Sequence, residues 1–184
     1  MERENWQDWQ ASCEAAKIVC LDESSIKTNF IPLRGWSKRG QRCPGKRPGR
    51  WQTYTMLSYL KYDGTTDGLI YSGGTDRKTF KNFMEDVLLP AVTRGDIIIM
   101  DNLNVHKNSF DENLFMQKGV TIKYIPRYSP EYNPIEMMWS KVKAYVRKKE
   151  PRDFLSVWRE TSIAKLNVTP EDAHGWYKEA GYCH

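Results

Sequence analysis

The sequence of 184 residues predicts an α/β fold, with a mixed central sheet of about five strands and helices on its flanks. Three observations predict it. Residues 17–22 and 96–101 each contain four consecutive apolar residues followed by an aspartate, a pattern typical of strands buried on both faces. Residues 76–89 and 134–149 place apolar side chains at helical spacing. Strand-like and helical segments alternate along the rest of the chain.

The first half of the chain predicts three strands followed by a helix. In order, the expected elements are a helical or irregular lead-in at residues 1–16, strands at 17–22, 51–60 and 68–71, and a helix at 76–89. Turn residues at 62–64 join the second strand to the third. Asp76 is the expected N-cap of the helix and Pro90 its stop, since proline cannot continue a helical hydrogen-bond ladder.

The second half alternates between the two element types. The expected elements are strands at residues 96–101 and 120–125, a short helix at 107–117, a loop at 126–133, and helices at 134–149, 152–166 and 170–179. Asn133 is the expected N-cap of the helix at 134–149, with Pro134 at its first position. The domain proper therefore spans residues 17–184.

Composition excludes several classes of protein. With 40% hydrophobic residues the chain can build a core, so global disorder and collagen-like order are excluded. No apolar run approaches the ~20 residues of a membrane span, and we expect a soluble, cytoplasmic protein without a membrane partner. Four cysteines without a C-x-x-C pair indicate free thiols in place of a disulfide framework or a zinc site.

Positive charge is concentrated in one stretch. Residues 27–50 hold eight basic residues and no acid, and with them set aside the formal net charge falls from +5 to −3. We expect a basic loop insertion there that binds a polyanion, while a solvated surface loop remains the alternative. For Trp36 and Trp51, buried anchoring of the loop is the first expectation and stacking on bases or sugars the second.

Two aspartates are candidates for metal chemistry. Asp22 and Asp101 each end a predicted strand, and if these strands are parallel neighbours both carboxylates emerge at one edge of the sheet. Neighbouring carboxylates repel one another unless a divalent cation with oxygen ligands, Mg²⁺ or Mn²⁺, neutralises them. The alternative is that both aspartates only form turns or cap helices, which stays open at this point.

Glu136 is the third candidate. It stands three residues after Asn133, so it also fits an N-terminal capping box, and pattern alone favours capping. The helix surface beyond it favours chemistry, because Glu136 shares one face with Ser140, Lys143 and Arg147. A carboxylate continued by a basic track suits a metal site beside a phosphate backbone.

Three sequence blocks together resemble one family. They are Leu-Asp-Glu-Ser at residues 21–24, Met-Asp-Asn-Leu-Asn-Val-His at 100–106, and Tyr-Ser-Pro-Glu-Tyr-Asn-Pro-Ile-Glu at 128–136 followed by Trp-Ser-Lys-Val-Lys at 139–143. These blocks resemble those of the DDE transposases of the mariner superfamily, most closely its bacterial insertion-sequence branch. The 34 residues between Asp101 and Glu136 also match that branch. As a set the blocks are specific, although each alone is weak.

The resemblance implies a ribonuclease H-like fold and a catalytic centre with two divalent ions, Mg²⁺ or Mn²⁺. Asp22, Asp101 and Glu136 would be the catalytic residues and the metal ligands. Residues expected to support those ligands are Asn102, His106 and Asn133. Two ions held by carboxylates can activate a water or a 3′-hydroxyl and stabilise the departing oxygen of a phosphodiester. The implied activity is cleavage at transposon ends and transfer of the 3′-hydroxyl into target DNA, at TA in this superfamily.

DNA, both transposon ends and target, is the partner that the resemblance implies. The expected DNA-binding residues are Arg34, Lys38, Arg39, Arg42, Lys46, Arg47, Arg50, Lys141, Lys143 and Arg147. A homodimer is expected because two transposon ends must be joined, and a bacterial, nucleoid-associated location follows from the same resemblance. The chain departs from the family in starting close to the first catalytic strand, so end recognition would need a missing N-terminal domain or a separate helix-turn-helix polypeptide. Arg127 replaces a usual proline.

Rival functions remain. A ribonuclease H or a resolvase would share the fold and the metal chemistry, but the block at residues 128–136 favours a transposase. A non-catalytic DNA-binding or regulatory protein derived from a transposase is the alternative from another class. A P-loop resemblance at residues 40–47 fails because Arg47 stands where Ser or Thr is required.

Overall fold

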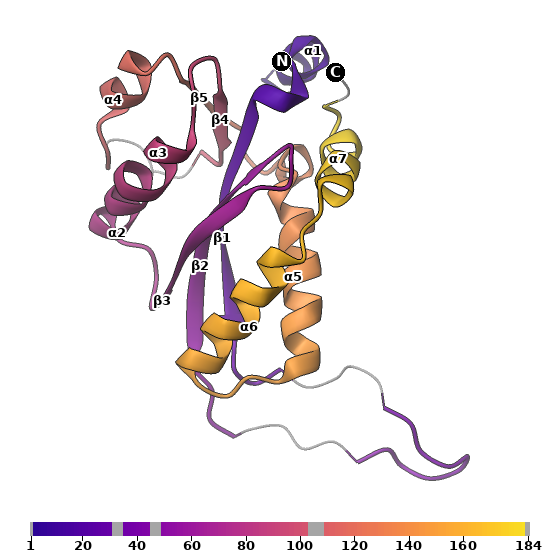
Figure 1. The fold of residues 1–184 in the computed structure, drawn as a ribbon. Coiled ribbons are helices and arrows are strands. Elements are labelled where there is room, and N and C mark those ends of the chain that lie inside the picture. The colour runs from indigo at the N-terminus through magenta and orange to yellow at the C-terminus, as the bar shows by residue number, and fades with distance from the viewer. Residues whose placement is uncertain (1, 31–34, 45–48, 103–108, 183–184) are drawn as a thin grey trace.

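The structure, a computed structural model, describes residues 2–30, 35–44, 49–102 and 109–182. Its centre is a five-stranded sheet of order β3-β2-β1-β4-β5 with helices on both faces (Figure 1). The strands are β1 (Ile18–Lys27), β2 (Thr53–Lys61), β3 (Thr66–Ser72), β4 (Ile97–Met100) and β5 (Thr121–Tyr124). The pairs β1–β2 and β2–β3 are antiparallel, whereas β1–β4 and β4–β5 are parallel. The predicted mixed sheet of about five strands is therefore confirmed.

Strand β1 runs further than the sequence pattern predicts. It continues to Lys27, so the prediction that the strand ends at Asp22 is wrong. The reason is that β2 pairs with β1 along nearly its whole length, from Val19 to Lys27, and supplies hydrogen bonds to the polar residues that look like a turn. The parallel pairing with β4 ends at Cys20 and Ile99. Asp22 therefore lies beyond the end of one pairing and inside the other.

Seven α-helices are assigned in the described chain, and most match the predicted ones. They are α1 (Glu2–Ser12), α2 (Arg77–Asn82), α3 (Leu89–Ala91), α4 (Glu112–Gln117), α5 (Ile135–Lys149), α6 (Phe154–Leu166) and α7 (Pro170–Glu179). A π-helical segment, Phe83–Leu88, joins α2 to α3, and short 3-10 turns lie at Ala15–Lys17 and Pro130–Tyr132. Asp76 caps α2 as predicted, because its carboxylate accepts a hydrogen bond from the Thr79 amide at 2.7 Å.

Two helix boundaries differ from prediction. The helix predicted at 107–117 begins only at Glu112, where the Asp111 side chain accepts from the Asn113 amide at 3.0 Å; residues 107 and 108 lie outside the described residues. Pro90 does not end its helix, which continues to Ala91. Proline is tolerated there because neighbouring amides carry the ladder: that of Leu89 donates to Met84, and that of Val92 donates to Leu88.

Two apolar cores lie on opposite faces of the sheet. One joins α1, α5, α6 and α7 to the sheet and includes the buried Trp139, Tyr177 and Tyr182. The other lies under α2, α3 and α4. In the first core the Tyr177 hydroxyl, from α7, lies 2.9 Å from the carbonyl oxygens of both Ile18 and Leu60. The last described helix is therefore attached to the start of β1.

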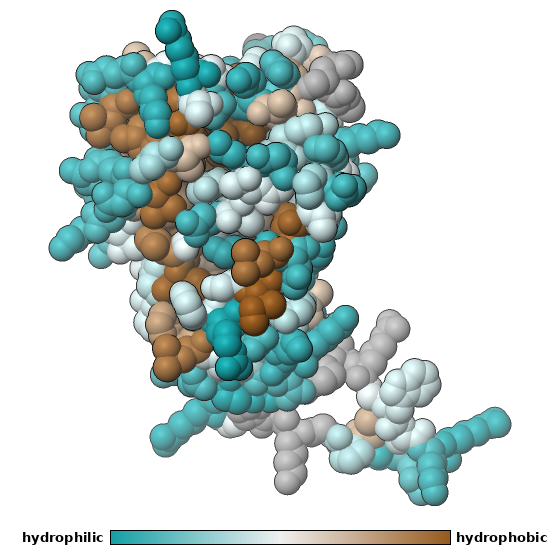
Figure 2. Space-filling view, in the orientation of Figure 1, coloured by the Kyte–Doolittle hydropathy of each residue, from teal (hydrophilic) through white to brown (hydrophobic). Residues whose placement is uncertain are grey.

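The described part of the basic insertion projects beyond the body of the domain (Figures 1 and 2). All side chains of residues 35–44 are exposed. Trp36 is 100% exposed and Trp51 is 54% exposed, so the expected buried anchoring by these two residues is wrong. The physical reason is that the insertion leaves the end of β1 without a core against which a tryptophan could pack.

The sequence predicts free cysteines and no membrane-spanning segment. Cys13, Cys20 and Cys43 are free thiols, whereas Cys183 lies outside the described residues. Among the described residues no helix is long and apolar enough to cross a bilayer.

Strand packing predicts the effect of one substitution. Gly68 pairs with Ser58, and a Cβ at Gly68 would lie 2.1 Å from the backbone oxygen of Leu57. Because backbone must then shift, we expect Gly68→Ala to lower the free energy of unfolding by about 2 kcal/mol, measured by urea denaturation. Gly74→Ala is the matched control, since a Cβ there meets nothing within 4 Å. Equal effects of the two substitutions would contradict the tight contact.

Candidate active site

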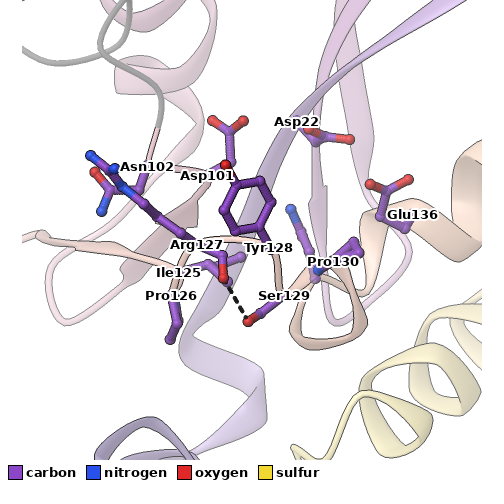
Figure 3. A pocket seen from close by; sticks show the side chains of 11 residues that line it. Asp22, Asp101, Asn102, Ile125, Pro126, Arg127, Tyr128, Ser129, Pro130 and Glu136 are labelled. Carbon is purple, nitrogen blue, oxygen red and sulfur yellow. Dashed lines mark hydrogen bonds between the residues drawn. The ribbon is translucent and has the colours of Figure 1, made fainter. Parts of the chain in front are cut away.

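Three carboxylates from different elements line one pocket of about 420 Å³ (Figure 3). Asp22 comes from β1, Asp101 directly follows β4, and Glu136 lies in the first turn of α5. The remaining wall is the segment between β5 and α5, together with Asn102. The pocket residues besides the three acids are Asn102, Ile125, Pro126, Arg127, Tyr128, Ser129, Pro130 and Asn133. The structure thus brings together the three residues that the sequence analysis selected.

Strand register explains why Asp22 and Asp101 meet. In the parallel pair β1–β4, Cys20 is opposite Ile99, and each aspartate stands two residues further along its strand direction. Equal offsets from a paired position in parallel strands place side chains at the same edge of the sheet, which is where such sheets bind ligands. The expectation that these strands are parallel neighbours is confirmed.

Helix α5 is attached to β1 by Asn133. This residue is buried, and its side-chain amide donates to the carbonyl oxygen of Leu21 at 3.3 Å. The predicted capping box is wrong: Pro134 occupies the N-cap position, without a side-chain hydrogen bond. Asn133 binds instead to the buried carbonyl of Leu21, just beyond the end of the parallel pairing. The Glu136 carboxylate therefore lines the pocket and does not cap the helix.

Burial and mutual repulsion set the charge state of the acids. Burial, followed by the charges of Glu136 and Asp101, raises the pKa of Asp22 to about 7. The Trp139 indole partly opposes this shift by donating to Asp22 Oδ2 at 3.1 Å. Burial also raises the pKa of Glu136, against the opposing charge of the half-buried Lys143. The pocket therefore has an excess of negative charge that a cation would relieve.

The donor set fits a divalent metal site with open coordination positions. The described residues contain no three histidine, cysteine, aspartate or glutamate side chains placed to hold one ion jointly. Mg²⁺ does not need such a cage, because it commonly takes one or two carboxylates and completes its shell with water and substrate phosphate. The side-chain oxygens of Asn102 and Asn133 are buried and accept no hydrogen bond from the described residues. The predicted supporting residue His106 lies outside the described residues.

The sequence analysis missed the support of the pocket wall by α1. Arg3 Nη2 donates to the carbonyl oxygen of Tyr128 at 2.7 Å, and Gln7 Nε2 donates to the Tyr132 hydroxyl at 3.0 Å. From the other end of the chain, the Tyr182 hydroxyl donates to the Tyr132 carbonyl at 3.0 Å. Partners so far apart in sequence leave no periodic or spacing signal. The chain pattern predicted only a helical or irregular lead-in.

The predicted DNA-binding residues fall into separate groups. Lys38, Arg39, Arg42 and Arg50 are exposed in the projecting insertion, whereas Arg34, Lys46 and Arg47 lie outside the described residues. On α5, Lys143 is near enough to Glu136 and Asp22 for their charges to raise its pKa against the larger effect of burial. The Arg147 guanidinium lies 5.1 Å from the Phe30 ring centroid. Lys141 is already engaged in helix packing, through an ion pair with Asp172 and a hydrogen bond to the Asn167 carbonyl at 2.9 Å.

Strand order and helix placement define a ribonuclease H-like domain. The same fold occurs in the Mos1 transposase paired-end complex with left transposon end, at a TM-score of 0.74 and 14% identity over 98% of this chain and 58% of that one. The catalytic domain of Mos1 mariner transposase gives a TM-score of 0.66 and 13% identity over 98% of this chain and 87% of that one. This chain therefore spans less than two thirds of the transposase chain in the complex.

The chain belongs to the DDE superfamily endonucleases, whose family profile matches residues 17–156. The matched segment contains all three acidic residues of the pocket. A comparison with curated proteins finds no match.

Charge in the pocket predicts a pH-dependent stability. Because the folded chain keeps the Asp22 proton up to about pH 7 and the unfolded chain releases it near pH 4, the free energy of unfolding falls as pH rises between these values. We expect Asp22→Asn to stabilise the metal-free protein by on the order of 2 kcal/mol at about pH 8, with little effect near pH 4. Thermal unfolding with a chelator measures this difference.

A matched control is Asp86→Asn, which changes an exposed acid outside the pocket. Its effect on stability should be small at both pH values. Equal stabilisation by the two substitutions, or a loss of stability in Asp22→Asn at high pH, would contradict the repulsive pocket.

Proposed function

We propose that this chain is the catalytic domain of a DDE transposase that cleaves DNA at transposon ends and transfers the 3′-hydroxyl into target DNA. One observation carries the proposal: carboxylates from β1, from the residue after β4 and from α5 line a single open pocket. Asp22, Asp101 and Glu136 would hold two divalent ions, Mg²⁺ or Mn²⁺. Support comes from the family match and from a related fold whose structures include the Mos1 catalytic domain with Raltegravir and Mn.

The residues of the chain have distinct tasks in this proposal. When bound, the divalent ions would activate the attacking water or 3′-hydroxyl and stabilise the departing oxygen of the phosphodiester. Asp22 and Glu136 provide anionic oxygens whose raised pKa reflects their burial. Trp139 fixes one oxygen of Asp22 through its indole N–H. Lys143 balances the charge of Glu136 and lies where the α5 surface would meet a phosphate backbone.

The basic insertion would hold DNA outside the pocket. Lys38, Arg39, Arg42 and Arg50 are exposed there, with Arg34, Lys46 and Arg47 in the same stretch of sequence. Exposed basic side chains on a projecting loop can reach phosphates that a compact surface could not. Trp36 and Trp51 are exposed beside these residues, which supports stacking on bases or sugars. On α5, Lys143 and Arg147 extend the proposed contact surface.

Several details of the proposal rest on the resemblance of the three sequence blocks to the mariner superfamily. They are insertion at TA, membership of the bacterial insertion-sequence branch, action beside the nucleoid, and a homodimer that brings two ends together. End recognition by a helix-turn-helix region, on this polypeptide or on a separate one, is a further part. Of these parts, only the joining of two ends has support from solved structures of a related fold, the Mos1 paired-end complex and strand transfer complex.

Nicking of supercoiled plasmid tests the proposed centre. With Mg²⁺ or Mn²⁺ we expect nicking by the wild-type chain and at least a hundredfold slower nicking, about 3 kcal/mol in activation free energy, by Asp101→Asn. The reason is that the amide retains the size of the side chain but loses the charge that binds the ion. Asp86→Asn, with the same chemical change at an exposed site, should nick at the wild-type rate.

Retained nicking by Asp101→Asn would refute the site. Absence of nicking by every variant, with DNA binding intact, would favour the non-catalytic DNA-binding alternative. Loss of nicking in Asp86→Asn as well would assign the effect to a general change in the protein.

The salt dependence of DNA affinity tests the insertion. Each phosphate contact contributes about 0.9 to the slope of log affinity against log salt, so we expect the double variant Arg39→Ala and Arg42→Ala to reduce the slope by about two. Fluorescence anisotropy with a duplex oligonucleotide measures it. The matched control is Arg77→Ala with Lys78→Ala, two exposed basic residues on α2. An unchanged slope in the first variant would exclude these contacts.

A further inference from the structure

Tyr128 stands at the rim of the acidic pocket with its side chain in solvent. It is 92% exposed and lines the same pocket as the three acids (Figure 3). Burial of an aromatic ring normally stabilises a fold, but the exposed Tyr128 ring contributes almost no stability through burial. The position of Tyr128 is therefore explained by something other than packing within the domain.

The backbone at Tyr128 adopts a conformation that most residues avoid. Its φ of 58° lies in the left-handed region, where the side chain of an L-residue meets its own backbone. Glu150 is the other non-glycine residue with positive φ in the described chain, and it ends α5, a position where left-handed residues are common. Tyr128 ends no helix. Strained residues of this kind concentrate at functional sites, where the surrounding structure holds them.

Contacts at Tyr128 and after it hold its backbone in place. Arg3 Nη2 donates to the Tyr128 carbonyl, and the Arg3 guanidinium also lies 3.7 Å from the Glu131 carboxylate. After it, Ser129 is buried and Tyr132 packs against Trp6, with ring centroids 6.3 Å apart. The exposed ring is thus carried on an anchored segment. An exposed aromatic on an anchored segment is pre-organised to meet a ligand.

We propose that Tyr128 is a DNA-contacting residue that stacks on a base or sugar next to the phosphate held in the acidic pocket. This inference rests on the proposed function, since it names a further contact to the same substrate. The neighbouring Arg127 is also exposed and lines the pocket, so a guanidinium for a phosphate lies beside a ring for a base. Stacking on a π-face tolerates any base, so this contact does not depend on the sequence of the DNA.

Photo-cross-linking tests the contact without requiring cleavage. The full chain is irradiated with a duplex oligonucleotide that has a single-stranded 3′ overhang and carries 5-iododeoxyuridine at one position at a time. We expect the cross-linked peptide to contain Tyr128 for positions close to the duplex end. Cross-links that form only on other peptides, at every position, would overturn the proposal.

Three substitutions separate the ring from the backbone. Tyr128→Phe keeps the ring, Tyr128→Ala removes it, and Tyr128→Gly removes it while accepting the left-handed conformation without strain. We expect affinity for the same oligonucleotide to be unchanged in the first variant and about tenfold weaker in the other two. Wild-type affinity in both Ala and Gly variants would overturn the proposal. Wild-type affinity in the Gly variant alone would also overturn it, because backbone conformation would then explain the loss.

These outcomes are distinct from failure of the proposed function. If the wild-type chain does not nick plasmid but cross-links through Tyr128, the nuclease assignment fails and the contact stands. If it nicks in an Asp101-dependent way and the Tyr128 variants bind normally, the contact fails and the nuclease stands. Loss of self-association in Tyr128→Ala without loss of DNA affinity would assign the ring to a protein contact and overturn the proposal.

Discussion

The parallel pairing of β1 with β4, and its end at Cys20 and Ile99, is the constraint on which the site depends. Up to that point the two strands are buried, and the backbone groups that face each other are paired by hydrogen bonds. Beyond it β1 remains paired with β2 alone, so the side of β1 that faced β4 opens to form a pocket. Asp22 and Asp101 sit just past this point, and the carbonyl of Leu21 is free to accept the Asn133 side chain that fixes the start of α5. A single mismatch in strand length thus creates the opening, directs two acids into it and attaches the helix that carries the third.

The pocket holds acidic side chains that repel one another, and the apolar cores on both faces of the sheet support it. Asp22 is held among apolar side chains and near two other acids, which explains its raised pKa. Such an arrangement persists only because strands and helices on both faces of the sheet fix the backbone that carries it. Other elements fix the backbone of the remaining pocket wall. Both α1 and the segment after α7 form hydrogen bonds to Tyr132, in the turn at Pro130–Tyr132. The exposed positive charge of the insertion projects away from the body of the domain, whereas Lys143 on α5 lies close enough to Glu136 to offset part of its charge.

Much of the fold could be predicted from the sequence because its signals are local. The run at 96–101 gave β4 within one residue at either end, and the apolar spacing in 134–149 gave α5. The three acids were selected by pattern and by family resemblance, and they do line one pocket. Errors arose where a distant partner overrides a local preference: β2 extends β1 through a polar stretch, and Leu21 takes the Asn133 side chain that would otherwise cap a helix. The prediction that Trp36 is buried was wrong because an aromatic side chain is buried only where an apolar core lies within reach. Support of the pocket wall by Arg3 had no signal, since the two partners are separated by 125 positions.

The attachment of α7 to the first strand sets the order in which the domain can be completed. Tyr177 contacts the carbonyl oxygens of Ile18 and Leu60, and Tyr182 holds the turn beside the pocket. Translation makes β1 before these tyrosines, so a growing polypeptide that has not yet reached Tyr177 lacks the contacts that attach α7 to the sheet. Long-range contacts of this kind also slow folding, because the loop between the partners must close before they form. A translation product that stops between Glu136 and Tyr177 would thus carry all three acids of the pocket without the contacts that attach α7 to the sheet and hold the turn beside the pocket.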